Sequence, residues 1–275
     1  MIDLIVFVTN PGQLSHAHLN MHTMGLRSFT VLVDNLDALY QRGIESGYEF
    51  LSEPVDADWG DLGRVRFVVV KDVMGNAIEL VQTSEVTPGE GKVKRIFSTN
   101  QNTRDIDWAL DFYRDGCGMT VEAIVEHSGD EFSQSFAVPK DARATTYYLK
   151  GTNPEAKTYF SLTAWEKPTL DKQELEPLHT PSYYRQWFWI EGNKDNVWAL
   201  WNKMAPKMPA IGAEPFCYNS MRPWSEATMS FFTDNDGVLQ EFANQVCGVP
   251  NEWKGLGVLV DDPEFGKNFE PKTKW

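Results

Sequence analysis

A short acidic turn occurs twice in this chain, at 72–80 and 234–242, and it limits the choice of folds more than any other pattern. Each copy has a Gly at the tip of the turn, followed by apolar residues that alternate with polar ones and include one acid, Glu79 or Glu241. A tight turn followed by alternation of period two predicts a hairpin that leads into a half-buried strand. Each Glu then faces either a cavity or the solvent, and the alternation does not decide which.

The residues before each turn repeat the same order of predicted elements. Residues 29–33 read as a β-branched strand, Asn35 caps a helix that Gly47 ends, and three strand patterns follow up to residue 82. The order of strand, helix and three strands begins again near residues 95 and 184. A repeat of roughly eighty residues is stronger evidence for the fold than any local motif. We predict an α+β fold of three βαβββ units, called here the first, second and third modules.

Composition restricts the partners of the protein. Of the 275 residues, 42% are hydrophobic, which is ample for a packed core, and the formal net charge is −14. Without a basic run, this charge argues against nucleic acid or an anionic membrane surface as partner. Three cysteines without a Cys-x-x-Cys spacing indicate neither a disulfide framework nor a zinc knot. Residues 2–8 carry an acid where a signal peptide has basic residues, so we interpret them as a strand and expect a cytoplasmic protein.

Three stretches resemble the vicinal oxygen chelate superfamily, the group of glyoxalases, extradiol dioxygenases and bleomycin-resistance proteins. They are residues 35–40 with 72–80, residues 105–115 with 118–119, and residues 232–242. The second stretch is similar to the "SLAFYRDVLGM" opening that is common in this family. The resemblance implies repeated βαβββ modules that pair into incomplete mixed-sheet barrels around a cavity. It also implies a divalent metal in that cavity, held by His and Glu.

Modules of this family normally occur in pairs, whereas this chain has three modules and a lone strand. We expect an N-terminal domain over 1–88 with one full module and the lone strand, and a C-terminal domain over 89–247 in which the second and third modules pair. Residues 248–275 are expected to form a tail. The incomplete N-terminal pair is either completed by another subunit or left open, and we expect a homo-oligomer.

The resemblance places a metal-ligating His seven residues before each helix cap, and a Glu on each closing strand. The His positions hold Ser28, Ser98 and, with the register open by one residue, Arg185 or Gln186. The closing positions hold Val6, Glu79, Ser161 and Glu241. Hydroxyls and one carboxylate bind a transition metal too weakly to retain it. We therefore expect no His-ligated metal and no other cofactor, with a hard oxygen-ligated divalent ion as the alternative.

These positions define the predicted site. Glu241 and Arg185 are the predicted catalytic residues, since an inward Arg185 would carry positive charge in place of the metal. The predicted substrate-binding residues are Ser98, Asn100, Ser161, Gln186, Trp187 and Tyr147. Glu79 is either a surface acid or a cavity acid. The remaining candidates also have structural readings: Asn100 and Asn102 as outward strand residues, Tyr147, Tyr148, Trp187 and Trp189 as core, and His16, His18 and His22 as a linker rather than a metal site.

Two functions are consistent with this set of residues. The first is a lyase or isomerase that acts on a small aromatic or carbonyl compound, in which Glu241 moves a proton beside a carbonyl and Arg185 or Gln186, with Ser98, stabilises charge on oxygen. Extradiol cleavage fits badly because it needs a redox metal. The second is a non-catalytic protein that binds or sequesters such a compound, which the loss of metal ligands and the ten tryptophans favour.

Overall fold

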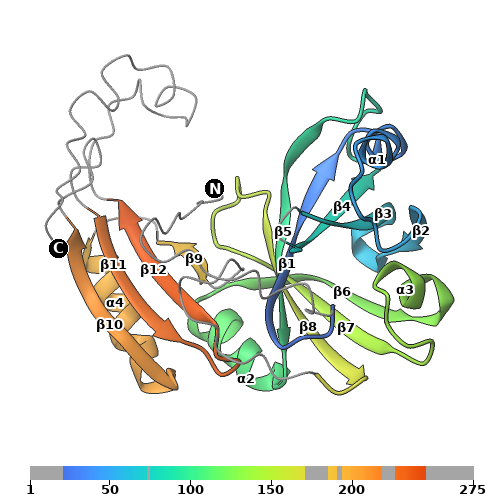
Figure 1. Ribbon diagram of the computed structural model, residues 1–275. Coiled ribbons are helices and arrows are strands. Elements are labelled where there is room, and N and C mark those ends of the chain that lie inside the picture. The colour runs from blue at the N-terminus through green and yellow to red at the C-terminus, as the bar shows by residue number, and fades with distance from the viewer. Residues whose placement is uncertain (1–20, 73–74, 171–184, 191–193, 219–226, 246–275) are drawn as a thin grey trace, which may run out of the picture.

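The computed structural model describes residues 21–72, 75–170, 185–190, 194–218 and 227–245. Their strands form an eight-stranded sheet with the order β2-β3-β4-β1-β5-β8-β7-β6 and a four-stranded sheet with the order β10-β11-β12-β9. Figure 1 shows the larger sheet curling on one side of the molecule and the smaller sheet on the other. The predicted α+β fold of βαβββ modules is confirmed. The predicted strand at 2–8 and tail at 248–275 lie outside the described residues.

The first module consists of β1 (Gly25–Val33), α1 (Leu36–Glu45), β2 (Val55–Asp58), β3 (Arg64–Lys71) and β4 (Ala77–Thr83), with a short helical turn η2 (Gly60–Leu62) after β2. Asn35 begins α1 as predicted, because its side chain accepts a hydrogen bond from the Ala38 amide at 3.1 Å. The closing strand β4 runs parallel to β1 and places Thr30 beside Glu79. This pairing makes the first and last strands of the module neighbours in the sheet, with Thr30 and Glu79 side by side.

The second module consists of β5 (Val93–Thr103), α2 (Ile106–Leu110) with its continuation η3 (Asp111–Gly116), β6 (Thr120–Ser128), α3 (Gly129–Ser135), β7 (Arg143–Lys150) and β8 (Tyr159–Lys167). Strand signals at 133–138 predict a strand there, and this prediction is wrong, because α3 covers residues 133–135 and Phe136 is its C-cap. Phe132 and Phe136 are four residues apart, so both lie on one side of α3 and its C-cap. Both pack into the hydrophobic cluster of the large sheet.

The third module consists of β9 (Arg185–Trp189), α4 (Lys194–Met204), η4 (Ala205–Lys207), β10 (Ala210–Tyr218), β11 (Ala227–Thr233) and β12 (Leu239–Gln245). Its closing strand β12 runs parallel to β9, as β4 does to β1. Both predicted turns have a Gly with positive φ, 85° at Gly75 and 83° at Gly237, a conformation that residues with a Cβ rarely adopt.

The large sheet joins the first module to the second, which differs from the expected pairing of the second with the third. Strands β1 and β5 are antiparallel, with Ser28 beside Asn100 and Thr30 beside Ser98. The linker between the modules is held against the first of them, where Asp34 accepts hydrogen bonds from the amides of Gly91 and Lys92 at 2.8 and 2.6 Å. The expected boundary after residue 88 therefore falls between two strands of one sheet.

The two faces of the large sheet are covered differently. On its inner face, aromatic and aliphatic residues from all eight strands, η2 and α3 form one cluster, which includes Trp59, Phe97 and Tyr148. On its outer face, α1 covers the first module, while α2 and the third module cover the second. Tyr113 is fully buried in this outer cluster.

A polar network fixes the third module to the outer face of β5. Asp234, in the second acidic turn, accepts hydrogen bonds at Oδ2 from Gln101 Nε2 (2.7 Å), Tyr113 OH (2.9 Å) and Gln240 Nε2 (2.8 Å). Its Oδ1 accepts from the amides of Asp236 and Val238 at 3.0 and 2.9 Å. Burial raises the pKa of Asp234, and these donors oppose that rise.

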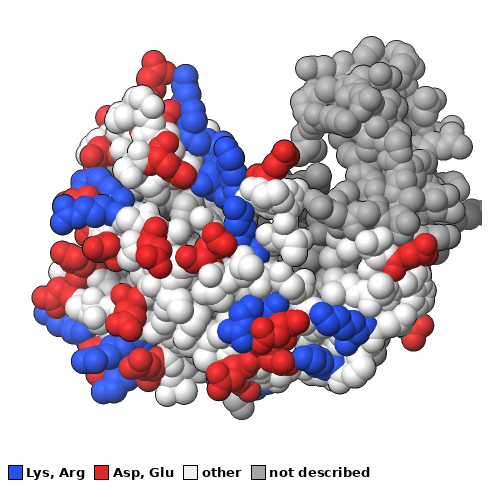
Figure 2. Space-filling view, turned by 180° about the vertical axis from the view of Figure 1, so that it is seen from behind, with Lys and Arg blue, Asp and Glu red and all other residues white. Residues whose placement is uncertain are grey.

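The surface carries its negative charge in dispersed form. Figure 2 shows acidic and basic side chains lying beside one another over the described part of one face. Ion pairs such as Lys71–Glu49 (2.7 Å) and Lys207–Asp111 (2.6 Å) belong to this pattern. None of the helices in the described ranges is both long and apolar enough to cross a membrane.

Candidate functional site

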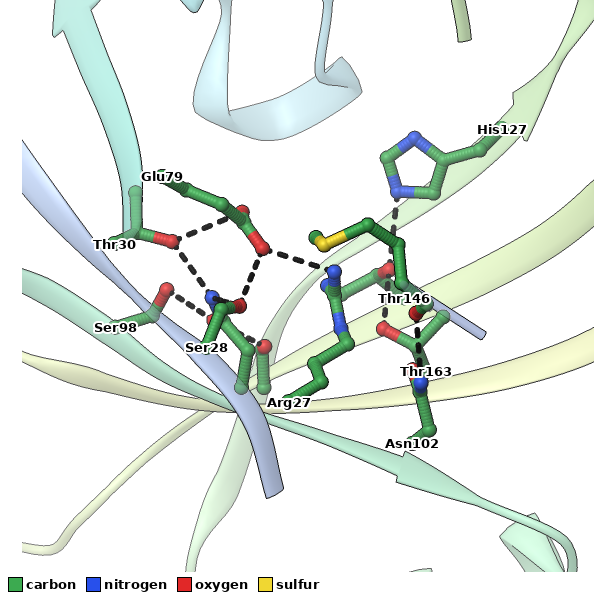
Figure 3. A network of polar contacts seen from close by, with 12 residues as sticks. Arg27, Ser28, Thr30, Glu79, Ser98, Asn102, His127, Thr146 and Thr163 are labelled. Carbon is green, nitrogen blue, oxygen red and sulfur yellow. Dashed lines mark hydrogen bonds and ion pairs between the residues drawn. The ribbon is translucent and has the colours of Figure 1, made fainter. Parts of the chain in front are cut away.

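Four of the positions at which the family resemblance places metal ligands, those of the first and second modules, meet in one polar cluster on the inner face of the large sheet. Ser28 and Glu79 come from the first module, and Ser98 and Ser161 come from the second. All four are buried, with Glu79 only 3% exposed. Figure 3 shows the first-module side chains pointing toward one another across β1 and β4.

Asn100 connects the two halves of this cluster. Its Nδ2 donates to Ser28 Oγ at 2.8 Å and to Thr30 Oγ1 at 2.9 Å. Its Oδ1 accepts from the hydroxyls of Ser98 and Ser161, both at 2.7 Å. Both N–H donors and both acceptor positions of this amide are used, so Asn100 is locked between the two modules.

Glu79 accepts hydrogen bonds from the hydroxyls on the first-module side. Ser28 Oγ donates to Oε1 at 2.6 Å, and Thr30 Oγ1 donates to Oε2 at 3.1 Å. The Arg27 guanidinium adds an ion pair, with Nη1 2.9 Å from Oε1. Both side chains of the pair are buried, at 6% exposure for Arg27 and 4% for Glu79. A buried pair of this kind is strongly destabilised if only one partner is removed.

A β-bulge places Arg27 on the inner face. In a regular strand, Arg27 and its neighbour Ser28 would point to opposite faces. The register of β1 against β5 shifts between Leu26 and Ser28, which leaves Arg27 as the extra residue of the ladder. Bulges re-aim side chains in this way and are common beside active sites.

The guanidinium of Arg27 keeps donors that no group among the described residues uses. Nε and Nη1 are buried and have no hydrogen-bond partner, because the N–H bonds of Nη1 are not aligned on Glu79 despite the short distance. The cation lies over the ring of Phe136, 5.4 Å from its centroid. A buried donor without an acceptor costs about 1–3 kcal/mol, and more when it is charged. An unsatisfied buried group of this kind calls for an explanation, such as a catalytic role or a bound ion or water.

A second polar strip lies on the other side of Arg27 (Figure 3). His127 Nε2 is 3.0 Å from Thr146 Oγ1, which is 2.8 Å from Thr163 Oγ1. The His127 ring stacks on Phe132 with centroids 5.2 Å apart. Burial and the charge of Arg27 lower the pKa of His127 to about 3, so this imidazole is neutral at physiological pH.

Aromatic side chains surround the cluster on the inner face. Trp59 stacks on Tyr148 with centroids 5.9 Å apart, and Phe97 lies edge-on to Tyr148. The Trp59 Nε1–H is buried without a hydrogen-bond partner. Burial raises the pKa of Tyr148, and the nearby charge of Glu79 raises it further. This wall suits a flat apolar group.

A hollow of about 880 Å³ opens at one edge of the inner face, between α3 and strands β2 to β4. Its lining includes Val65 and Thr83 from the sheet and Glu131 from α3. Thr83 shares a strand face with Glu79, four residues along β4. Neither Glu79 nor Arg27 is among the residues that line this hollow.

The donor set does not fit a family-type metal site. No cluster of three His, Cys, Asp or Glu side chains exists within the described ranges. Glu79 is the one carboxylate of the cluster, and it is already paired with a cation. The other positions offer neutral hydroxyls and an amide that are bonded to one another, which is a poor set for Zn²⁺ or a redox metal.

Several predicted residues meet here, although from a different pair of modules. Ser98, Asn100 and Ser161 are in the cluster, and Asn102 shares their face, where it donates to the carbonyls of Met21 and Thr23. The reading of Glu79 as a surface acid is wrong, because it is buried. The structure places Tyr147 on the outer face, where it packs against the outer cluster, since alternation gives the inner face to Tyr148.

The predicted third-module site is described only in part. Glu241 is buried on β12, and its backbone lies beside that of Trp187. Gln240 and Phe242, on either side of it, face β5 and the outer cluster, so Glu241 points to the opposite side of its sheet. The side chains of Arg185, Gln186, Trp187 and Trp189 lie outside the described residues, as do His16 and His18.

Sequence reasoning missed Arg27, Thr30 and His127. Thr30 alternates with Ser28 and could have been included on that ground. Arg27 had no such signal, since a strict period of two assigns it to the other face. His127 reaches the site through the pairing of β6 with β7, which adjacency in sequence does not indicate.

Comparison with known proteins supports the fold. No family model and no curated protein matches the sequence. Among solved structures, glyoxalase I from Zea mays is similar with a TM-score of 0.57 at 15% identity, over 82% of this chain and 69% of that one. A putative dioxygenase from Bacillus subtilis is similar with a TM-score of 0.52 at 13% identity, over 82% of this chain and 64% of that one. Together with the βαβββ modules and their pairing, these similarities show that the chain has the fold of the vicinal oxygen chelate superfamily.

Proposed function

We propose that the protein is an enzyme of small-molecule metabolism, of lyase or isomerase type, that acts on an aromatic or carbonyl compound without a His-ligated metal. The observation that carries this proposal is the buried Arg27–Glu79 pair at the place where the two modules bring their site positions together. An acid and a cation held side by side, next to an aromatic wall, suit proton transfer beside a carbonyl group.

In this proposal, the two charged groups have separate roles. Glu79 moves the proton, held in place by the hydroxyls of Ser28 and Thr30 at 2.6 and 3.1 Å. Arg27 stabilises the negative charge that develops on the substrate oxygen, which is worth most in a dry site. Asn100 keeps the hydroxyls in register between the two modules.

Deuterium exchange tests this assignment without knowledge of the product. Aromatic carbonyl compounds with a C–H beside the carbonyl are incubated with the full chain in D₂O, and loss of that C–H signal is followed by NMR. We expect exchange with at least one such compound, and a fall of about 100-fold or more in Glu79→Gln. Glu241→Gln is the matched control and should retain the rate. Loss in Glu241→Gln with retention in Glu79→Gln would overturn the proposal and move the chemistry to the third module.

A second candidate is a protein of the same fold that binds or sequesters its ligand without turnover. The observation that favours it is the filling of the inner face by aromatic residues, with Phe132 and Phe136 of the α3 region packed into the same cluster. Tight binding of such compounds, with no exchange above that of a heat-denatured sample, would favour this function over the enzyme.

A further inference from the structure

We propose that Arg27 binds an oxyanion of the ligand, and that the ligand is therefore a flat carboxylic acid or a compound that carries the equivalent negative oxygen. This inference rests on the proposed function, because it names the ligand class of the same inner-face site. It adds a binding role for a residue to which the family resemblance assigns none.

The first reason is the unused hydrogen-bonding capacity of Arg27. Its side chain is more than nine-tenths buried, yet Nε and Nη1 have no acceptor. Glu79 does not supply one, although Nη1 approaches it to 2.9 Å. Both carboxylate oxygens of Glu79 already accept from Ser28 and Thr30, which hold the carboxylate where it is. A further acceptor has to come from outside this cluster.

The second reason is the contrast with Arg95, which occupies a similar aromatic setting. Arg95 lies 5.3 Å from the centroid of Phe97, much as Arg27 lies 5.4 Å from that of Phe136. Arg95 uses its donors, with Nη2 bonded to Glu85 at 2.7 Å and Nη1 bonded to the carbonyls of Lys157 and Ile96. The ring contact alone therefore does not account for the unused donors of Arg27.

The third reason is the chemistry of the surroundings. His127 is neutral, so Arg27 carries the positive charge of the described inner-face cluster. Only the negative charge of Glu79 compensates it there. A guanidinium binds planar oxyanions through paired N–H groups better than it binds neutral acceptors. The rings of Phe136, Trp59 and Tyr148 provide the apolar surface for the rest of a flat molecule.

Isothermal titration calorimetry on the full chain tests the inference with matched pairs of probes: benzoate and benzamide, phenylacetate and phenylacetamide, cinnamate and cinnamamide. We expect at least one acid to bind about 10-fold or more tighter than its amide. Arg27→Met should remove that preference, with a loss of about 10- to 100-fold for the acid and little change for the amide. Arg95→Met, the matched control, should leave both affinities unchanged.

A second measurement follows binding in wild-type protein, so its result does not depend on whether Arg27→Met folds. In wild-type protein, the NMR signal of the Arg27 Nε–H, assigned by its absence in Arg27→Lys, should shift when the acid binds and stay in place with the amide. Equal binding of acids and amides would overturn the oxyanion inference and leave the proposed site intact. The role of Arg27 would be overturned if an acid binds without shifting the Nε–H signal and binds Arg27→Met as tightly as it binds wild type. Failure of every acid and amide to bind would overturn the proposed function as well.

Discussion

Asn100 and Gln101 are neighbours on β5, but they belong to two different buried networks. Asn100 points to the inner face and joins the hydroxyls around Glu79, whereas Gln101 points to the outer face and donates to Asp234. Each network contains a buried acid from a closing hairpin, Glu79 on β4 and Asp234 in the turn before β12. They differ in how completely the charges are satisfied.

The outer network is closed around its buried charge, although Gln240 Oε1 has no hydrogen-bond partner among the described residues, while the inner network is open at Arg27. Asp234 accepts five hydrogen bonds from protein groups, three at Oδ2 and two at Oδ1. Arg27 keeps two buried nitrogen atoms without an acceptor. A closed network holds two parts of a protein together, and an open one stores a cost that a ligand can relieve. The outer network therefore holds the third module against β5, and the inner network is the one at which we propose that a ligand binds.

The largest expected effect comes from removing the inner acid. Glu79→Leu leaves the Arg27 charge buried without its partner, so the free energy of unfolding, measured by urea denaturation, should fall by about 3–5 kcal/mol. The double variant Arg27→Met/Glu79→Leu should regain most of this loss, since no unpaired charge remains. A double variant as unstable as the single one would show that the ion pair is not the source of the effect.

A smaller effect is expected in the outer network. Asp234→Asn replaces one acceptor oxygen with an NH₂ group that faces donors, so we expect a loss of about 2–3 kcal/mol in the free energy of unfolding. Ligand affinity in the inner site should not change. Asp72→Asn is the matched control in the first acidic turn, where Asp72 accepts from the amide and side chain of Asn76 at 2.8 and 3.0 Å. It should cost less than about 0.5 kcal/mol. Equal losses in the two turns would contradict the docking role of Asp234.

A still smaller effect is expected in the pH dependence of stability, to which His127 on the inner face contributes. The pKa of His127 is about 3 in the folded protein and 6.5 when unperturbed, so the unfolded chain takes up this proton first on acidification. The contribution of His127 is thus fully present above pH 6.5 and is lost as the pH falls toward 3. His127→Phe should lower the fall in unfolding free energy between pH 7 and pH 5 by about 1–2 kcal/mol relative to wild type. Parallel profiles for the two proteins would show that His127 is not held neutral.

The modules and several residue positions of the site could be predicted from the sequence. Which modules pair with each other could not. The order of elements and the caps at Asn35 and Asp105 follow from local chemistry, so they could be predicted. Ser98, Asn100 and Asn102 alternate along β5, and this spacing alone is enough to place them on one face. The pairing of β1 with β5 depends on contacts between modules, and the lone strand predicted at 2–8 indicated instead that the second module pairs with the third.

Two features of the site could not be predicted for physical reasons. Arg27 reaches the inner face through a β-bulge, and a one-residue irregularity reverses the face that alternation assigns. The α3 helix replaces an expected strand, because Phe132 and Phe136 satisfy a helical spacing as well as an apolar strand pattern. In both cases, packing against another segment decides between two local readings.

The central claim is that the Arg27–Glu79 cluster works in place of a His-ligated metal, and chelation tests it most directly. The rate of C–H exchange in D₂O should be measured before and after dialysis of the full chain against EDTA, with metal content followed by mass spectrometry. The account predicts the same rate in both samples, and loss of that rate in Glu79→Gln. A rate that disappears on chelation and returns with one divalent metal at one ion per chain would contradict it.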